Sequence, residues 1–308
     1  MRFVIAGATG FVGGALCAKL EKDGHHITTL TRDVESAKRK LGAGIQCIEW
    51  GGKARDNWRE TLNGADVVIN LAGEPVAGQR WTSDYKERIS HSRVEASRAL
   101  VAAIGQVKQK PAALISASAV GYYGNTKDAD VTEETPPGTD FLSKVCVAWE
   151  TETRNAALYG VREARLRIGI ALGNGGALKE MLNPLPIPFS PWKLGLGGPM
   201  GSGRQWFPWI HIADVVGLFA WAAENPQVSG PLNATAPLPV TSAKFAHAIG
   251  RVLHRPALLP VPGFALKLAL GEFADSLLGG QKAFPVVAER LGYAFQYREV
   301  SKALADLL

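Results

Sequence analysis

The chain has few cysteines and no long apolar run. Only three of its 308 residues are cysteine, namely Cys17, Cys47 and Cys146, and their spacing is not that of a metal site. We therefore expect reduced, buried thiols and no metal, as in a cytoplasmic protein. No apolar stretch approaches the roughly 20 residues that a membrane helix needs. The sequence predicts no membrane partner.

Charge of one sign is not concentrated in any run. The formal net charge is +6, but the basic residues are scattered among acidic ones. Proteins that bind nucleic acid usually gather Lys and Arg in a patch or stripe. We therefore expect a mild attraction for anionic ligands and no nucleic-acid partner. The hydrophobic content of 46% and the charged content of 20% are typical of a globular protein.

The first dozen residues predict a phosphate-binding turn. A short apolar segment forms a candidate strand over residues 2–6, and Gly7, Gly10 and Gly13 follow it. At these spacings the missing side chains let backbone N–H groups approach a pyrophosphate and let a helix pack closely on the strand. The positive end of that helix then faces the anion. An ordinary tight turn with glycines at its corners is the alternative.

The segments around the turn favour a dinucleotide. Apolar residues recur at helical spacing after the turn, Gly24 ends the predicted helix, and a second strand is predicted over residues 26–30. Thr31 and Arg32 follow this strand in place of the acidic residue that binds a ribose 2′-hydroxyl. Arg32 therefore favours NADP (NADPH) over NAD. The alternative is a solvated surface cation whose charge Asp33 offsets.

Segments typical of strands and helices continue to alternate after this unit. Further strands are predicted at residues 45–50, 66–71, 113–116, 165–168 and 231–234, and helices at 82–107, 141–159 and 212–225. This alternation predicts an α/β protein with a Rossmann-type, doubly wound, mostly parallel sheet and helices on both faces. Ligands are then expected beyond the carboxyl ends of the strands.

The composition changes after residue 172. Residues 173–209 are rich in glycine, proline and tryptophan, including the proline-rich run at 183–188, and helices are expected at 241–254 and 263–278. We expect a dinucleotide-binding domain made of residues 1–172 and about 205–235. Residues of about 173–204 and 236–308 are expected to form a smaller, mainly helical C-terminal lobe that binds the substrate.

Several sequence motifs resemble those of the extended short-chain dehydrogenase/reductase superfamily. They are the glycine turn, Asn70-Leu71-Ala72-Gly73-Glu74, Val120-Gly121-Tyr122-Tyr123-Gly124, Gly203-Arg204-Gln205-Trp206-Phe207-Pro208-Trp209-Ile210-His211 and Asn233-Ala234-Thr235-Ala236-Pro237. More closely, the chain resembles the atypical branch of NAD-dependent epimerase/dehydratase-like proteins, which includes nucleoside-diphosphate-sugar epimerases. The likeness covers essentially the whole chain and implies a Rossmann fold with NADP as the cofactor and a small-molecule substrate.

The resemblance also implies which residues hold the cofactor. The residues implied to contact its phosphates are Gly7, Thr9, Gly10, Phe11 and Val12 at the pyrophosphate, and Thr31 and Arg32 at the adenosine phosphate. The other implied contacts are Leu71, Ala72, Gly73 and Glu74 along the nucleotide, Arg93 on the long helix and Ile168 beside the nicotinamide. Core packing is the alternative for Leu71 and Ile168, and a solvated or ion-paired helix face for Arg93.

The chain lacks the catalytic tyrosine of short-chain reductases at its usual position, and this absence bears most directly on function. A short-chain reductase uses a tyrosine that exchanges a proton with the substrate oxygen, and a lysine four residues later that lowers the pKa of the tyrosine. No tyrosine occurs in the corresponding helix. Alignment on Glu150 places Leu142 and Cys146 at the tyrosine and lysine positions. Alignment on Lys144 places Asp140 at the tyrosine position.

Other side chains are candidates for the chemistry. Ser118, at the end of the fifth strand, is a candidate for binding a substrate oxygen, and Tyr122 or Tyr123 for supplying the proton. Both tyrosines are equally compatible with walls of a cleft. Arg204 is a candidate clamp for an anionic substrate, and Trp206 for stacking on a flat ligand. A surface role for Arg204 and a core role for Trp206 are the alternatives.

Two functions therefore compete. The first is an NADP-dependent oxidoreductase or epimerase-like enzyme that acts on a small substrate, with sugar nucleotides as a candidate class. The second is an NADPH-binding redox-sensing or regulatory protein that has lost the catalytic tyrosine. His211 and Asp214 are expected to close a strand-to-helix turn and not to act in catalysis. The sequence leaves a homodimer open.

Overall fold

The central element is a parallel sheet of seven strands in the order β11-β7-β5-β4-β1-β2-β3. The computed structural model describes residues 1–51, 57–183 and 190–308, so the prolines at 184–188 lie outside the described residues. The strands are β1 (Arg2–Ala6), β2 (His26–Thr31), β3 (Gln46–Glu49), β4 (Val67–Asn70), β5 (Ala113–Ala119), β7 (Arg162–Ile168) and β11 (Gly230–Ala234). The chain winds outward from β1, returns to β4 and winds outward on the other side. The predicted Rossmann-type fold is confirmed.

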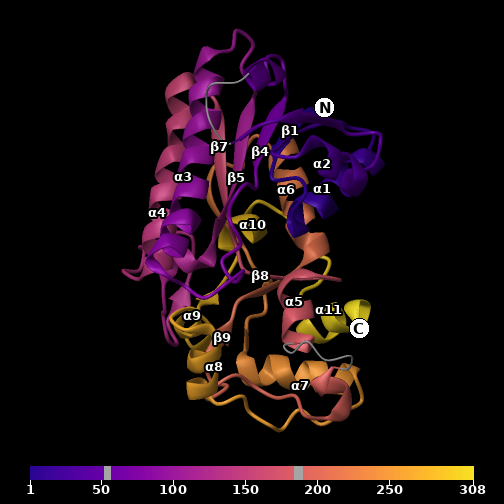
Figure 1. The fold of residues 1–308 in the computed structure, drawn as a ribbon, viewed down its shortest axis with the longest axis vertical. Helices are drawn as coiled ribbons and strands as arrows, with labels where there is room; N and C mark the ends of the chain where they lie inside the picture. The colour runs from indigo at the N-terminus through magenta and orange to yellow at the C-terminus, as the bar shows by residue number, and fades with distance from the viewer. Residues whose placement is uncertain (52–56, 184–189) are drawn as a thin grey trace.

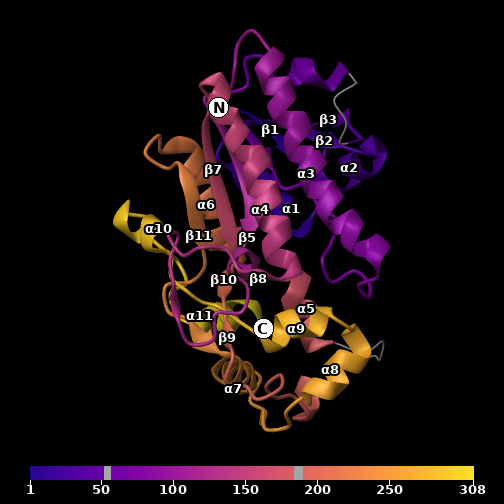
Figure 2. The same ribbon diagram turned by 90° about the vertical axis from the view of Figure 1, so that its left-hand side faces the viewer.

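Helices cover both faces of this sheet (Figures 1 and 2). They are α1 (Phe11–Lys22), α2 (Val34–Leu41), α3 (Ser83–Gln106), α4 (Phe141–Arg154) and α6 (Ile212–Glu224). Helices α1 and α6 pack on one face, and α3 and α4 lie side by side on the other. The point where the winding reverses lies between β1 and β4, where ligands of such sheets bind.

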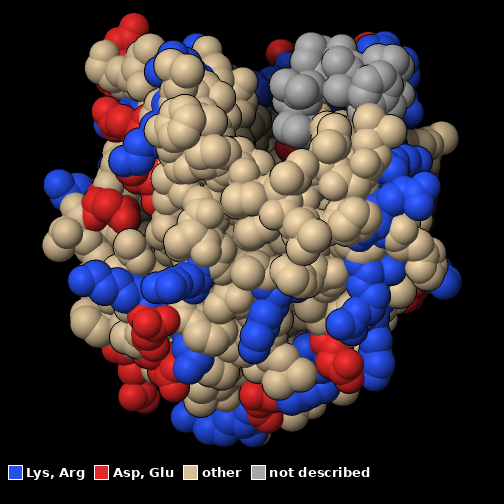
Figure 3. All heavy atoms as spheres, turned by 90° about the horizontal axis from the view of Figure 1, so that it is seen from below, with Lys and Arg blue, Asp and Glu red and all other residues tan. Residues whose placement is uncertain are grey.

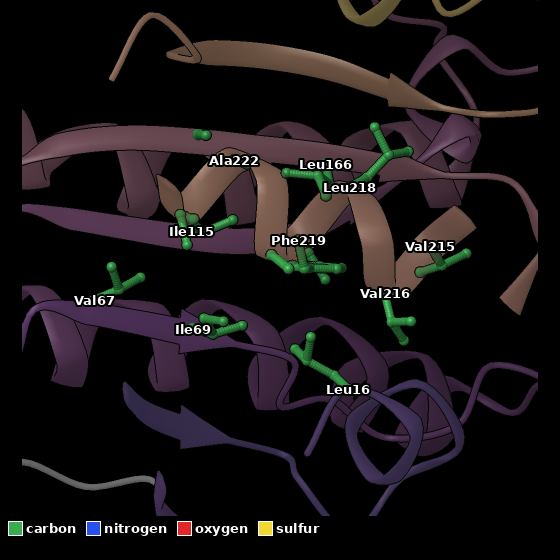
Figure 4. Close-up of a cluster of buried hydrophobic side chains, with 14 of the residues drawn as sticks. Leu16, Val67, Ile69, Ile115, Leu166, Val215, Val216, Leu218, Phe219 and Ala222 are labelled. Carbon is green, nitrogen blue, oxygen red and sulfur yellow. The ribbon is translucent and has the colours of Figure 1, made fainter. Parts of the chain in front are cut away.

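The core lies on the two faces of the sheet. Successive residues of a strand point to opposite faces, so Ile5 packs with α1 and α6, and Val4 packs with α3. Both are buried, as expected for a parallel strand covered on both sides. Figure 4 shows side chains from α1, α6 and the strands meeting in this core, including Leu16, Ile69 and Phe219.

Smaller elements, most of which form the lower part of the molecule in Figure 1, complete the fold. They are β6 (Asp130–Val131), β8 (Ile170–Leu172), α5 (Gly176–Leu182), β9 (Trp206–Phe207), β10 (Trp209–His211), β12 (Val240–Thr241), α7 (Ser242–Val252), α8 (Gly263–Leu270), α9 (Phe273–Leu278), β13 (Lys282–Ala283), α10 (Val286–Arg290) and α11 (Val300–Leu307). Short strand pairs join distant segments, because β8 pairs with β10, β9 with β12 and β6 with β13.

The structure corrects several predicted elements. The helix predicted at 141–159 ends at Arg154 and continues as a 3-10 helix over Asn155–Tyr159. The helix predicted at 263–278 is two helices, because Gly271 between them has φ +62° and ends α8. Helix α2 was not predicted, nor were α10 and α11.

The three cysteines are free thiols. Cys17 and Cys146 are buried as predicted, whereas Cys47 on the short strand β3 is half-buried, so the prediction was wrong for Cys47. Within the described ranges, no helix is long and apolar enough to cross a membrane.

Candidate functional site

The glycine turn is closed by contacts that exclude side chains. Gly7 has φ +82°, and a Cβ there would lie 2.5 Å from the carbonyl carbon of Leu71. A Cβ on Gly13 would lie 2.3 Å from the oxygen of Gly7, so α1 packs directly on the turn. Gly10 precedes α1 and brings no capping side chain, and the first turn of the helix holds no acidic residue. The first backbone N–H groups of α1 are therefore available to an anion.

A cavity of about 1330 Å³ opens where this turn meets the ends of β2 and β4. The predicted cofactor residues that line it are Gly7, Thr9, Gly10, Thr31, Arg32, Leu71, Ala72, Gly73 and Glu74. Residues not predicted also line it, including Ser36, Trp50, Pro75, His91 and Ser92. The cavity lies at the point where the winding of the sheet reverses. Its size and its glycine cradle fit a dinucleotide.

Four other residues that were predicted to hold the cofactor do not line the cavity. They are Phe11, Val12, Gly13 and Ile168. The ring of Phe11 packs on the glycine turn at 173–176, where a Cβ on Gly173 would lie 2.7 Å from the ring. Val12 packs against the core, and Gly13 lies beneath the turn. Ile168 ends β7 and is half-buried against the same core. Core packing therefore explains Val12 and Ile168 whether or not a cofactor is bound.

The end of β2 shows what the acidic residue beside Arg32 does. The Asp33 carboxylate accepts a hydrogen bond from the backbone N–H of Ser36 at 2.9 Å and so caps α2. The Arg32 side chain is exposed, and it makes no ion pair within the described part of the chain. The capped helix brings Ser36 to the cavity beside Thr31 and Arg32. The signal for α2 was Asp33 itself, a residue type that favours the N-cap, followed by Glu35 in the first turn.

The turn after β4 is held by polar residues that sequence reasoning missed. Buried Asn70 donates through Nδ2 to Ser97 Oγ at 2.9 Å, and its Oδ1 accepts from the Ala72 N–H at 3.1 Å. The Glu74 N–H donates to Ser92 Oγ at 3.0 Å. These bonds fix the backbone from Leu71 to Glu74 against α3, and this backbone forms one wall of the cavity.

Arg93 lies at the inner end of that wall. Its Nη1 donates to the carbonyl oxygens of Glu74 at 2.9 Å and Ile89 at 3.0 Å. Its guanidinium carbon lies 5.3 Å from the ring centre of Trp149. A Cβ on Gly73 would approach this carbon to 3.0 Å, so the guanidinium lies in tight contact with the turn. Arg93 therefore packs between α3, α4 and the turn, and not on a solvated helix face.

The positions where a reductase keeps tyrosine and lysine hold apolar and buried groups. Leu142 packs on Gly121, where a Cβ would lie 3.3 Å from the leucine Cβ. Cys146 is buried, with its Sγ 3.8 Å from the carbonyl oxygen of Ala119. Burial raises the pKa of the Cys146 thiol to about 12. Leu142 has no proton to donate, and the thiol of Cys146 lacks the positive charge by which a lysine lowers the pKa of a tyrosine.

Ser118 belongs to a buried ionic cluster. Its Oγ donates to Glu150 Oε1 at 2.7 Å. The same carboxylate accepts from Arg167 Nε at 2.8 Å and Nη2 at 2.9 Å, and from Arg165 Nη1 at 3.2 Å. Glu150 and Arg167 are almost wholly buried. We refer to Ser118, Glu150, Arg165 and Arg167 as the arginine cluster. Sequence reasoning used Glu150 only as an alignment position and missed both arginines.

The two candidate tyrosines differ in their surroundings. The Tyr123 hydroxyl donates to Asn233 Oδ1 at 2.6 Å and accepts from Arg167 Nη1 at 2.9 Å. Burial is the main reason why the pKa of Tyr123 rises to about 12. The ring of Tyr122 lies under the same arginine, with its centre 3.5 Å from the guanidinium carbon. Among the described residues, the Tyr122 hydroxyl forms no hydrogen bond.

The predicted substrate residues lie in the lower part of the molecule. The Arg204 side chain is exposed. The indole N–H of Trp206 donates to Asp128 Oδ1 at 3.0 Å, and Lys282 Nζ lies 5.0 Å from the centre of its ring. Trp206 is half-buried, so it is neither a core residue nor a fully free stacking surface. Neither residue lines the cavity described above.

His211 and Asp214 close a strand-to-helix turn, as predicted. His211 Nδ1 accepts from the Ala213 N–H at 3.1 Å and caps α6, and its Nε2 lies 3.3 Å from Asp306 Oδ2. The buried Asp214 carboxylate accepts from the backbone N–H groups of Gln296 at 2.8 Å and Tyr297 at 2.9 Å. Within the described ranges, no group of three or more His, Cys, Asp and Glu side chains is arranged to hold a metal.

Sheet order, glycine turn and cavity together define a Rossmann-type protein of the extended short-chain dehydrogenase/reductase class. The chain belongs to the NAD dependent epimerase/dehydratase family, whose model matches residues 3–234. Residues 261–307 match a second model, a domain of unknown function (DUF1731).

Relatives of this family match the whole chain. An epimerase family protein SDR39U1 homolog of Arabidopsis thaliana, described as chloroplastic, is 41% identical over 100% of this chain and 87% of its own length. Epimerase family protein YfhF of Bacillus subtilis is 38% identical over 100% of this chain and 98% of its own. The crystal structure of human epimerase family protein SDR39U1 (isoform 2) with NADPH has a TM-score of 0.88 and 35% identity, and the match covers 100% of this chain and 99% of that one.

Proposed function

We propose that the protein is an NADP-dependent oxidoreductase of the epimerase type that acts on a small substrate. The observation that carries this proposal is the cavity in which the Gly7–Gly10 turn, the end of β2 and the Leu71–Glu74 turn meet. Any Cβ at Gly7 would fill the space at the glycine turn. The first N–H groups of α1 are free to bind an anion. The presence of NADPH in the human relative supports the same cofactor here.

The choice of NADP over NAD is proposed from the end of β2. Thr31, Arg32 and Ser36 line this part of the cavity with two hydroxyls and a cation, which suit a 2′-phosphate. The carboxylate of Asp33 is engaged in capping α2 and does not replace the acid of an NAD site. Relatives of lower identity that were solved with NAD show the fold alone.

Calorimetric titration tests this choice. We expect NADPH to bind at least about tenfold more tightly than NADH, because a charge-assisted contact to a phosphate contributes more than about 1.4 kcal/mol. Arg32→Asp is expected to remove this preference. Arg39→Asp is the matched control, because Arg39 is an exposed cation on α2 that does not line the cavity. Equal affinities for NADPH and NADH in the unaltered chain would contradict the proposal.

A bound nicotinamide cofactor supplies or accepts a hydride, so the chain must supply a proton. Helix α4 has no tyrosine, Ser118 donates to Glu150, and the Tyr123 hydroxyl is held by Arg167 and Asn233. The Tyr122 hydroxyl forms no hydrogen bond within the part of the chain that the structure describes. We therefore assign the proton transfer to Tyr122, held in place by the guanidinium of Arg167 against its ring. In this proposal Ser118, whose own proton is donated to Glu150, accepts a hydrogen bond from a substrate hydroxyl.

The substrate is proposed to bind between the sheet domain and the lower lobe of residues 173–204 and 236–308. Exposed Arg204 would meet an anionic group, and Trp206 would form a side of the site. Sugar nucleotides fit this arrangement. Their candidacy is supported by a nucleoside-diphosphate sugar epimerase structure from Corynebacterium glutamicum, with a TM-score of 0.75 and 32% identity, whose match covers 99% of this chain and 57% of that one.

The activity is tested in two ways. NADPH absorbance is followed with a panel of carbonyl compounds and keto-sugar nucleotides, and products are separated after incubation with sugar nucleotides and NADP, because an epimerase regenerates its cofactor in each turnover. Tyr122→Phe is expected to lower kcat by about 100-fold or more, since general acid–base catalysis contributes 10² to 10⁴. NADPH affinity is expected to be unchanged in this variant. Tight NADPH binding without turnover of any compound would overturn the enzyme proposal in favour of a redox-sensing or regulatory protein.

A further inference from the structure

Two segments that are distant in the sequence form one surface in the lower lobe. The N–H of Leu259 donates to the oxygen of Gly197 at 3.2 Å, and that of Val261 donates to the oxygen of Pro199 at 2.9 Å. The N–H of Gly201 donates back to the oxygen of Val261 at 2.9 Å. Helix α8 follows directly. Residues 193–201, 255–262 and α8 therefore form a continuous surface, which we name the leucine face.

The leucine face exposes apolar side chains. Phe264 and Leu268 are each 76% exposed, and Leu258 is 71% exposed. Phe264 and Leu268 are one helical turn apart on α8, and this helix buries none of its residues. The other exposed apolar residues of the leucine face are Leu194, Leu196, Leu259 and Val261. Contiguous apolar surface of this kind marks an interaction site.

The charge on the leucine face and on the segments that flank it is mainly basic. Residues 190–204 and 251–271 include Lys193, Arg204, Arg251, Arg255 and Lys267 but no Asp or Glu. Two acids follow these segments directly: Glu272 pairs with Lys86, and Asp275 on α9 lies 2.8 Å from Lys267. Both ion pairs are accessible to solvent and contribute little. Viewed from below, a broad uncharged area has Lys and Arg side chains along much of its border, with some Asp and Glu side chains among them (Figure 3). The fold thus gathers basic residues that are scattered in the sequence.

We propose that the leucine face docks on an anionic phospholipid bilayer. A second copy of the chain is disfavoured, because a symmetric contact would bring the basic residues of both copies together. Side chains that protrude from a helix and loops insert between lipid headgroups, and basic residues around them attract anionic lipids. Docking of this kind requires no membrane-spanning helix. The expectation of no membrane partner rested on spanning segments alone.

Vesicle co-sedimentation of the full chain tests the proposal. We expect the protein to sediment with vesicles of phosphatidylcholine and phosphatidylglycerol, to remain in the supernatant with phosphatidylcholine alone, and to be released by salt. The double substitution Phe264→Ser with Leu268→Ser is expected to weaken binding at least about tenfold, because it removes both exposed apolar side chains of α8. Lys193→Glu with Lys267→Glu is expected to have a similar effect.

Matched controls distinguish binding through the leucine face from nonspecific binding to vesicles. Leu158→Ser removes a side chain that is 79% exposed but lies on the sheet domain, and Lys38→Glu removes an exposed cation of α2. Both are expected to bind vesicles as the unaltered chain does, and NADPH affinity reports that every variant is folded. Absence of binding at low salt, or equal binding by the α8 double variant, would overturn the proposal. A dimer in light scattering that the α8 double variant abolishes would assign the face to a second copy instead.

Discussion

The carboxylate of Glu150 and the guanidinium of Arg167 meet in the interior, with Oε1 2.8 Å from Nε and Oε2 2.9 Å from Nη2. The glutamate comes from α4 and the arginine from β7, so the pair joins a helix to the sheet directly beneath Ser118. Two parallel hydrogen bonds of this kind fix the orientation of both side chains. The pair positions the groups on which the proposed chemistry depends.

Glu150→Gln is expected to destabilise the protein by about 3 kcal/mol, because loss of the carboxylate leaves Arg167 buried without its counter-ion. Urea unfolding measures the effect. The control is Glu152→Gln, which breaks the pair with exposed Arg98 and should cost about 1 kcal/mol or less. Equal losses in the two variants would show that the buried pair has no special role.

Comparison of Gly7→Ala with Gly24→Ala distinguishes the strain of a positive φ from the steric overlap of a new Cβ with neighbouring backbone. Both glycines have positive φ, but a Cβ on Gly24 meets nothing within 4 Å, whereas one on Gly7 would overlap Leu71. Gly24→Ala should therefore cost about 1 kcal/mol, the strain of the left-handed backbone alone. Gly7→Ala should cost more and should also weaken NADPH binding at least about tenfold, because the cavity wall has to move. Thermal unfolding measures the loss of stability, and calorimetry measures NADPH affinity. Unchanged NADPH affinity in Gly7→Ala would contradict the proposal that the glycine turn binds the cofactor.

The local elements of the fold could be predicted from the sequence, and the long-range contacts could not. Strand β1, its glycine turn and α1 are specified by neighbouring residues. Helix α2 has eight residues, so its apolar periodicity is too short to stand out, and its Asp33 cap was the stronger signal. Glu150 and Arg167 become partners only when α4 packs on the sheet, and nothing in their spacing indicates this.

Tyr123→Phe is expected to lower the free energy of unfolding by about 1 to 2 kcal/mol, because it removes one hydrogen bond of buried Arg167 and leaves the Oδ1 atom of buried Asn233 without its donor. Tyr122→Phe is expected to change stability by less than about 0.5 kcal/mol, since its hydroxyl forms no hydrogen bond among the described residues. The two unfolding curves, measured side by side, distinguish the structural tyrosine from the proposed catalytic one. A reversed order would remove the basis for assigning proton transfer to Tyr122.

Protonation of His211 is expected to make stability depend on pH. Burial lowers the pKa of this imidazole below its ordinary value of 6.5, although the nearby Asp306 and Asp214 oppose the shift. The unfolded chain therefore binds a proton that the folded chain resists, and the free energy of unfolding should fall as the pH drops through about 6.5. His211→Asn keeps a capping side chain and cannot be protonated, so its stability should vary less over this range. Exposed His247→Asn is the control and should leave the pH dependence unchanged.

The contacts of Asp214 bear on how the two family models relate to each other. The aspartate lies in the part of the chain that matches the epimerase/dehydratase family, and both of its backbone donors, Gln296 and Tyr297, lie in the part that matches the domain of unknown function. Strand β13 likewise pairs with β6 across the two parts. The two matched parts are therefore joined by buried hydrogen bonds and by a shared strand pair. A chain that ends before residue 261 would lack both backbone donors of Asp214 and the partner strand of β6, so it is expected to be less stable than the whole chain.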